Sequence, residues 1–153
     1  MTRINVGIKL NTLTDEHLLA EHREIKRLCS HFNKRLMMNK FDDIPTTFTL
    51  GTGHVLFFMN KGKYTLKRYL MIYKECLKRN LSVECYVSNW DIYKHNRMFA
   101  NDYNEHIHDT NILVERISDR LINGKKKIYH FYGNKISVED SIKLIQTNNE
   151  SIK

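Results

Sequence analysis

Apolar and polar positions recur with a helical period in three parts of the 153-residue chain. In the first part, side chains spaced three and four residues apart share one helix face; they are Leu18, His22, Ile25, Cys29, Phe32 and Leu36. Thr14 precedes this pattern as a candidate N-cap, and the acidic Asp15 and Glu16 suit the positive end of a helix dipole. The pattern predicts a single helix from about residue 15 to residue 36.

Two further segments predict helices. In residues 63–80 the expected apolar stripe is Leu66, Leu70, Tyr73 and Leu77, and the expected outward residues are Lys67, Lys74 and Lys78. In residues 111–124 the residues expected to point inward are Val114, Ile117 and Leu121. Asn123-Gly124 at the end of this segment offers a left-handed stop.

The remaining segments are shorter. Residues 51–54 suit a tight connection before the apolar run 55–59, which fits a strand or a buried helix equally well. Ser137 and Asp140 form a capping-box pattern for a short helix at 137–146, and residues 148–153 resemble a frayed tail. The sequence therefore predicts an all-α fold: a compact single domain of three main helices. The N-terminal segment packs beside the first helix, and a short extra helix follows at the C-terminus.

The net charge of the chain indicates what kind of partner to expect. The chain has 25 Lys and Arg against 17 Asp and Glu, a net charge of +8 that favours a polyanion, either nucleic acid or an anionic membrane surface. No apolar run approaches the roughly 20 residues of a membrane span, and no secretory signal is present. The three cysteines fit neither a disulfide framework nor a zinc ribbon. We expect a soluble, intracellular, cytoplasmic monomer that does not act at a membrane.

The start of the chain offers a candidate nucleophile. Met1 precedes the small residue Thr2, so its removal would expose the α-amine of Thr2. A terminal amine titrates near pH ~8 against ~10.4 for lysine, so roughly 10% is the free base at neutral pH. On the first predicted helix, Glu21 and Glu24 stand among Arg23, Lys26 and Arg27. The simple alternative is a solvated face on which Glu24 pairs with Arg27 three residues later.

Five motifs in one order carry a family resemblance: MTRIN, HLLAEHREIKR, PTTFTLGTGHVLFF, ECLKR and IYHFYG. Together they resemble the pyrimidine-dimer DNA glycosylase/AP lyase family, the endonuclease V type that excises UV photoproducts. The resemblance covers residues 1 to about 136. It implies a glycosylase-like domain at 1–136 and a C-terminal extension at 137–153.

The resemblance implies a mechanism without metal or cofactor. The Thr2 amine attacks sugar C1′, displaces the base and forms an imine, and β-elimination then cuts double-stranded DNA at the damaged or abasic site. Glu24 matches the catalytic carboxylate. His17 matches a residue at the site edge, and Glu21 is the next candidate carboxylate. The residues that match phosphate-binding arginines are Arg3, Arg23, Arg27, Arg116 and Arg120.

The segment after the third predicted helix suits kinked DNA. Its basic triplet and interleaved rings would hold phosphates and meet bases; the residues are Lys125, Lys126, Lys127, Tyr129, Phe131 and Tyr132. The alternative is that these rings fill the core. The chain departs from the family pattern at His22, Lys26 and Ile128, where the family has Tyr, Pro and Trp, so another damaged or modified base remains open as substrate.

Two rival functions come from other classes. A non-catalytic basic DNA-binding protein explains the charge, but not Thr2, Arg3 and Glu24 together. A metal-dependent nuclease lacks ligands, since His17 and His22 are five residues apart rather than the four of a helical metal pair. Borohydride trapping in EDTA separates all three, because only the lyase forms a reducible adduct.

Overall fold

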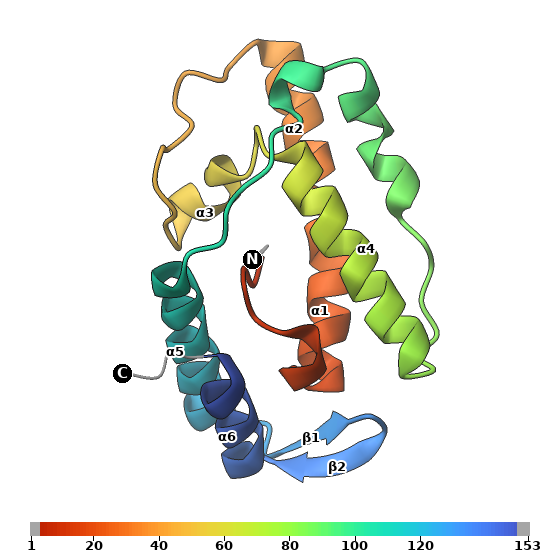
Figure 1. The fold of residues 1–153 in the computed structure, drawn as a ribbon, viewed down its shortest axis with the longest axis vertical. Helices are drawn as coiled ribbons and strands as arrows, with labels where there is room; N and C mark the ends of the chain where they lie inside the picture. Colours follow the sequence, from red (N-terminus) through yellow and green to blue (C-terminus); the bar gives the residue numbers. More distant parts are fainter. Residues whose placement is uncertain (1–3, 150–153) are drawn as a thin grey trace.

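The computed structural model describes residues 4–149, which form two helical groups on either side of the N-terminal segment (Figure 1). α1 and α4 lie together in one group, α5 and α6 in the other, and a two-stranded hairpin lies below them. In chain order the described elements are the 3-10 helix η1 (Leu10–Thr12), α1 (Asp15–Ile25), α2 (Arg27–Met38), α3 (Thr52–Phe57), α4 (Gly62–Lys78), the 3-10 helices η2 (Val87–Lys94) and η3 (Arg97–Phe99), α5 (Ile107–Asn123), β1 (Ile128–Phe131), β2 (Asn134–Ser137) and α6 (Val138–Asn149).

The expected all-α fold of three main helices is wrong, because residues 128–137 form an antiparallel hairpin and the described chain has six α-helices. The strands pair from Ile128 with Ser137 to Phe131 with Asn134. The two turn residues, Tyr132 and Gly133, both have positive φ, at 51° and 82°. Such a turn matches the right-handed twist of the strands, so it closes a two-residue hairpin.

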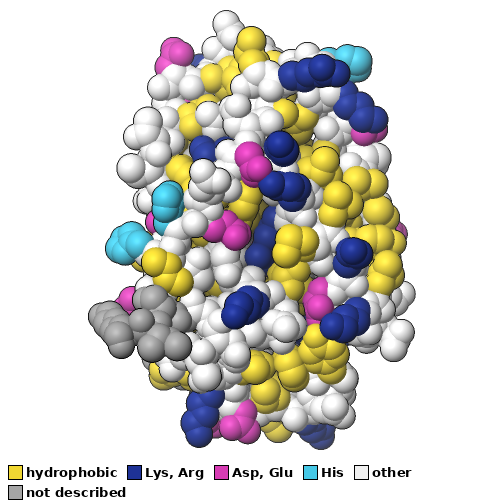
Figure 2. All heavy atoms as spheres, viewed as in Figure 1, with side chains coloured by type: hydrophobic (Ala, Val, Ile, Leu, Met, Phe, Trp, Pro, Cys, Tyr) yellow, Lys and Arg dark blue, Asp and Glu magenta, His cyan; other side chains and the backbone are white. Residues whose placement is uncertain are grey.

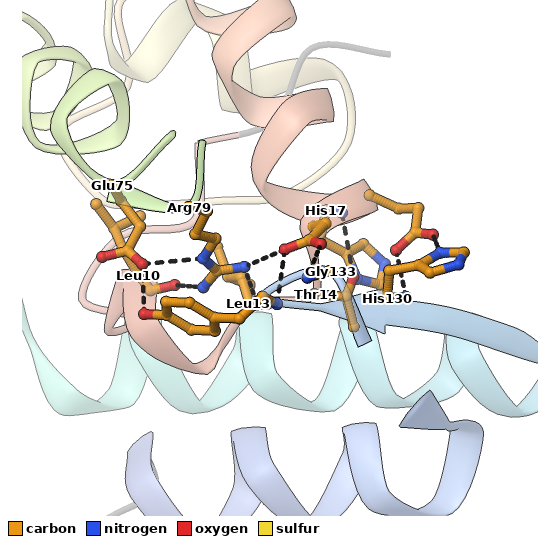
Figure 3. A network of polar contacts seen from close by, with 11 residues as sticks. Leu10, Leu13, Thr14, His17, Glu75, Arg79, His130 and Gly133 are labelled. Atoms are coloured by element: carbon orange, nitrogen blue, oxygen red, sulfur yellow. Dashed lines mark hydrogen bonds and ion pairs between the residues drawn. The ribbon is translucent and has the colours of Figure 1, made fainter. Parts of the chain in front are cut away.

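The acidic start of α1 anchors this hairpin (Figure 3). The backbone N–H groups of Tyr132 and Gly133 donate to Asp15 at 3.1 and 3.0 Å, and the backbone N–H of His130 donates to Glu16 at 2.8 Å. An isolated two-stranded hairpin is marginal in water. The hydrogen bonds to Asp15 and Glu16 therefore provide stability that the two strands alone would not have.

The first predicted helix is two helices, α1 and α2, separated at Lys26. The expected face is still the buried one: Leu18, His22, Ile25, Cys29 and Phe32 are all buried. The cap is also confirmed, since Thr14 Oγ1 accepts a hydrogen bond from the backbone N–H of His17 at 3.2 Å.

The apolar stripe expected on α4 is wrong. Leu70 and Leu77 are 41% and 50% exposed. Figure 2 shows hydrophobic side chains gathered on the surface along the α4 side of the face in view. The face that α4 buries is rotated from the expected stripe; its members are Tyr64, Thr65, Arg68, Tyr69, Ile72 and Cys76. Arg68 is buried because it forms an ion pair with Glu21 of α1. A charged residue that the sequence analysis did not assign to either face is thus part of the interior.

α5 buries Val114, Ile117 and Leu121 as expected. The left-handed stop expected at its end is wrong, because Gly124 is extended, with φ −73°. The apolar run at 55–59, left open between strand and helix, completes α3 and the turn that follows it.

α6 is part of the core rather than a loose appendage. It packs against α5, and Ser141 and Ile145 are fully buried. Ser137 Oγ accepts the backbone N–H of Asp140 at 3.1 Å, as a capping residue does. The frayed tail expected from residue 148 is wrong for Asn149, which is buried at the end of α6. Residues 150–153 lie outside the described part of the chain.

Candidate active site

The N-terminal segment is held residue by residue. Each of residues 4–9 forms a hydrogen bond with a side chain from a distant part of the chain: Ile4 N with His54, Asn5 with Glu21, Val6 O with Thr110, Gly7 N with Glu105, Ile8 O with Arg68, and Lys9 N with Asn149. Ile4, Val6 and Ile8 are also buried. Thr2 and Arg3, named from the sequence, lie outside the described residues. The chain that leads directly to them is fixed in place.

Gly7 shows how tightly this segment is packed. Its φ is +71°, and a Cβ at this position would lie 2.0 Å from Thr110 Oγ1. A side chain here would therefore be strained and would clash with α5. The sequence at this point permits a close approach between the N-terminal segment and α5.

Beside this segment lies a small cavity of about 50 Å³ between α1 and α5. Its wall is formed by Asn5, His17, Ala20, Glu21, Glu24, Ile117 and Arg120. Four of these residues were candidates from the sequence. The spacing of 17, 20, 21 and 24 places the α1 members on one helix face. The fold thus gathers His17, Glu21, Glu24 and Arg120 around one hollow next to the N-terminal segment.

Glu21 is the buried member of the two carboxylates. Its oxygens accept hydrogen bonds from Arg68 Nε and Nη2 at 2.8 and 3.0 Å, and from Asn5 Nδ2 at 2.8 Å. Burial works against the charge of Arg68, but the adjacent Glu21 carboxylate raises the pKa of the guanidinium above its usual value. Glu21 thus bridges Arg68 of α4 and Asn5, and it holds the N-terminal segment against α1.

His17 is oriented by two neighbours. Its Nδ1 is 2.8 Å from Thr14 Oγ1, and its ring stacks on Tyr129 of β1 with the centroids 5.5 Å apart. These contacts come from the helix cap and the hairpin. The hairpin thereby helps to define the wall of the cavity.

Glu24 is half-buried at the cavity, and no ion pair joins it to Arg27. The alternative in which Glu24 serves as the salt-bridge partner of Arg27 is therefore absent from the structure. Arg23, Arg27, Arg116 and Arg120 are all exposed. Within residues 4–149 none of these four guanidinium groups forms an ion pair, so their charge is available to a polyanion.

The lysines and tyrosines after α5 divide into two groups. Lys125, Lys126 and Lys127 are exposed, although Lys126 Nζ lies 3.2 Å from Glu16. Tyr129 is buried. Tyr132 donates its hydroxyl hydrogen to Glu75 at 2.6 Å, with the Arg79 guanidinium 4.2 Å from its ring. These contacts favour the alternative in which both rings pack inside the protein.

The departure at His22 also faces the interior. The ring of His22 lies among Tyr69, Tyr73 and Tyr86, and burial lowers its pKa. Lys26 Nζ lies 3.7 Å from the centre of the Tyr86 ring. The two departures on the first predicted helix therefore change one aromatic cluster rather than the cavity.

Sequence reasoning missed Asn5, Arg68 and Arg79. Arg79 is buried between Asp15 and Glu75, at 2.9 Å from each, and donates to the carbonyls of Leu10 and Leu13 (Figure 3). For Arg68 the available signal was a charged residue on a helix face that also carries apolar residues; Arg79, the residue that follows α4, gave none. Asn5 gave no signal, because a single asparagine suits many environments. In residues 4–149 no group of three or more His, Cys, Asp or Glu side chains is placed to hold a metal ion.

The described residues form a mostly helical fold with a cavity beside the N-terminal segment that contains two carboxylates, Glu21 and Glu24. The sequence matches the family model for pyrimidine dimer DNA glycosylases over residues 1–100, and the chain belongs to this family. The match confirms the resemblance drawn from the motifs and indicates a DNA repair glycosylase that acts on damaged DNA. It ends before α5, so Arg116, Arg120 and the hairpin lie beyond it. No helix in the described residues has the length and apolarity needed to cross a membrane.

Proposed function

We propose that the protein is a DNA glycosylase with AP lyase activity whose nucleophile is the α-amine of Thr2 after removal of Met1. The observation that carries the proposal is the N-terminal segment, fixed at every residue from 4 to 9 beside the cavity that contains Glu24. Asn5 is three residues after Thr2, so the chain between them spans at most about 11 Å. A fixed segment converts an encounter between amine and sugar into a positioned reaction.

The proposed steps conserve atoms and electrons. The neutral amine nitrogen bonds to C1′ as the glycosidic bond breaks, and the base leaves with one proton. The nitrogen lone pair then forms the imine as the C1′–O4′ bond breaks, and O4′ takes the remaining N–H proton. The imine acidifies C2′, so loss of its proton expels the 3′ phosphate and cuts the strand. Glu24 stabilises positive charge on the sugar and assists the C2′ proton transfer.

The exposed arginines supply the grip on DNA in this proposal. Arg23 and Arg27 flank Glu24 in sequence, and Arg120 lines the same cavity from α5. With Arg3 and Arg116 they would bind phosphates around the lesion, which we propose to be a pyrimidine dimer in duplex DNA. Lys125 and Lys126, which are exposed, would add further contacts with phosphates.

The test is borohydride trapping on dimer-containing, abasic and undamaged duplexes, in EDTA. We expect a covalent adduct with the first two duplexes. The matched control retains Met1, which moves the amine by one residue, about 3.8 Å. Equal adduct from the control would contradict the N-terminal mechanism. Reaction with the abasic duplex alone would point to another damaged base, and tight binding to all three without reaction to a non-catalytic protein.

A further inference from the structure

The outer face of α4 carries a regular apolar row that the fold leaves on the surface. Leu66, Leu70, Tyr73 and Leu77 follow one another at steps of four, three and four residues, the spacing of the a and d positions of a coiled coil. Leu70 and Leu77 are exposed, and Leu66 and Tyr73 are half-buried. The row forms one stripe about three turns long. Because α4 buries a different face in the core, the stripe remains accessible to another molecule.

A row of lysines runs beside this stripe. Lys63, Lys67, Lys74 and Lys78 are four, seven and four residues apart, and all four are exposed. Lys67 forms an ion pair with Asp102. In the described part of the chain, Lys63, Lys74 and Lys78 form neither an ion pair nor a side-chain hydrogen bond. One edge of the apolar stripe is therefore positively charged.

The stripe leads into a hollow at the start of α4. The hollow has a volume of about 540 Å³, and Leu66 and Lys63 line it together with Val87, Trp90 and Tyr93 of η2. Pockets of this size can enclose large side chains. Figure 2 shows hydrophobic side chains along the α4 side of the molecule, with Lys and Arg side chains beside them. The surface is thus apolar along its length and recessed at one end.

Charge and shape distinguish the possible occupants of this surface. A second copy of the chain would bring two lysine rows together, where like charges repel. A DNA backbone would match the lysines, but it offers no apolar surface to cover Leu70 and Leu77. A flat anionic bilayer would not fill the recessed hollow. A helix with an apolar stripe and acidic residues along one edge complements the stripe, the charge and the hollow together.

We propose that the outer face of α4 docks a protein partner through an amphipathic, acidic helix, whose apolar residues pack on Leu66, Leu70 and Leu77 and whose carboxylates face Lys74 and Lys78. Helices bind to grooves through anchors at this three- and four-residue spacing. The inference does not depend on the proposed glycosylase chemistry. The described lining of the Glu24 cavity comes from the N-terminal segment, α1 and α5.

The probe is a fluorescent three-heptad peptide with Leu at positions a and d and Glu at e and g. Its like charges oppose self-association. We expect the full chain to bind it with a Kd in the micromolar range, measured by fluorescence anisotropy without DNA. Leu70→Ser with Leu77→Ser should weaken binding about tenfold or more. Ile122→Ser, at a 57% exposed position on α5, is the control and should not.

The charge of the partner is tested separately. The same peptide with Lys in place of Glu should bind the wild-type chain at least about tenfold more weakly, because like charges then face each other. Lys74→Glu with Lys78→Glu should reverse this preference. Lys34→Glu with Lys40→Glu makes the same change of net charge at exposed positions elsewhere and should leave the preference intact. Exposed substitutions of this kind seldom unfold a protein.

Several outcomes would overturn the inference. Equal affinity for the Glu and Lys peptides, or for wild type and Leu70→Ser with Leu77→Ser, would show that this face does not dock an acidic helix. Leucine-dependent binding to phosphatidylserine vesicles without peptide binding would assign the face to a membrane. Leucine-dependent dimers in sedimentation would assign it to a second copy. Absence of borohydride trapping in the wild type would overturn the proposed function alone, since peptide binding does not require it.

Discussion

At the scale of single residues, Glu21 and Glu24 lie one turn apart on α1 in contrasting surroundings. Glu21 is buried, and its oxygens are bound by Arg68 and Asn5. Glu24 is half-buried at the same cavity and forms no ion pair with Arg27. A carboxylate that already forms an ion pair with a guanidinium group is poorly placed to stabilise positive charge that develops on a sugar. The contrast favours Glu24 for the reaction and Glu21 for holding the N-terminal segment.

Glu24→Gln should therefore retain affinity for damaged DNA and lose base excision. The amide keeps the shape but removes the charge that stabilises the transition state, and one such electrostatic interaction is typically worth about 10²–10³-fold in rate. Single-turnover base release and Kd for a dimer-containing duplex measure the two effects. The exposed Glu115→Gln on α5 is the control. An unchanged release rate would exclude Glu24 from this role.

The residues of the cavity could be predicted from the sequence only in part. His17, Glu21 and Glu24 share a helix face by spacing alone, so their grouping followed from the period of α1. Asn5 and Arg68 could not be placed, because their roles arise from one ion pair between residues 47 positions apart. Arg68 in particular was not assigned to either face of its helix, because its burial depends on the partner charge of Glu21 on α1.

At the scale of elements, the hairpin depends on the acidic start of α1. Its turn is Tyr132-Gly133 rather than a common Asn-Gly turn, so local sequence gave a weak signal. The contacts that hold it come from Asp15 and Glu16, more than 110 positions away. The local pattern of residues 124–134 gives no information about these distant partners. The strands were therefore missed because the contacts that stabilise them are tertiary.

Glu16→Gln should weaken this anchor in a pH-dependent way. Partial burial acts to raise the pKa of Glu16, but hydrogen bonds from His130 more than offset it and lower the pKa to about 2. Because this lies below the unfolded value of 4.5, the carboxylate stabilises the fold above pH 4.5 and loses that effect as the pH falls toward 2. We expect a loss of about 1–2 kcal/mol at pH 7.

Urea unfolding between pH 2 and pH 7 measures this effect. The stability curve of Glu16→Gln should be flatter than wild type between pH 2 and 4.5. Glu84→Gln, at an exposed position, is the control. Identical curves for wild type and Glu16→Gln would show that the hairpin is held without this carboxylate.

At the scale of the whole molecule, α6 joins the two ends of the described chain. Asn149 Oδ1 accepts the backbone N–H of Lys9 at 2.7 Å, and its Nδ2 donates to Thr12 at 2.9 Å. Asn149→Ala should lower the free energy of unfolding by about 1–3 kcal/mol, since it removes two hydrogen bonds between α6 and the N-terminal segment. The exposed neighbour Asn148 donates to Leu144 O within its own helix, so Asn148→Ala should change stability by about 0.5 kcal/mol or less. Equal effects in chemical denaturation would instead make residues 137–153 a separable extension.

DNA binding should depend on salt through the whole arginine set. If Arg3, Arg23, Arg27, Arg116 and Arg120 each neutralise one phosphate, log K should fall against log[salt] with a slope of roughly −4 to −5. Arg120→Ala should flatten the slope by about 1, whereas Lys78→Ala on α4 should not. Titrations at several salt concentrations give the slopes. A slope near zero would show that the net positive charge does not serve to bind DNA phosphates.

Three partners of the N-terminal segment, Glu105, Thr110 and Asn149, lie in the last third of the chain. Thr110 and Asn149, which bind Val6 and Lys9, follow them by 104 and 140 residues. Ribosomes add about 5–20 residues per second, so these partners emerge roughly 5–30 s after the segment they bury. During that interval the N-terminal segment cannot form its contacts with Thr110 and Asn149. An aminopeptidase that acts on nascent chains therefore has time to remove Met1. Chains stalled on the ribosome near residue 100 should already begin with Thr2, so the timing of translation would itself expose the amine that we propose as the nucleophile.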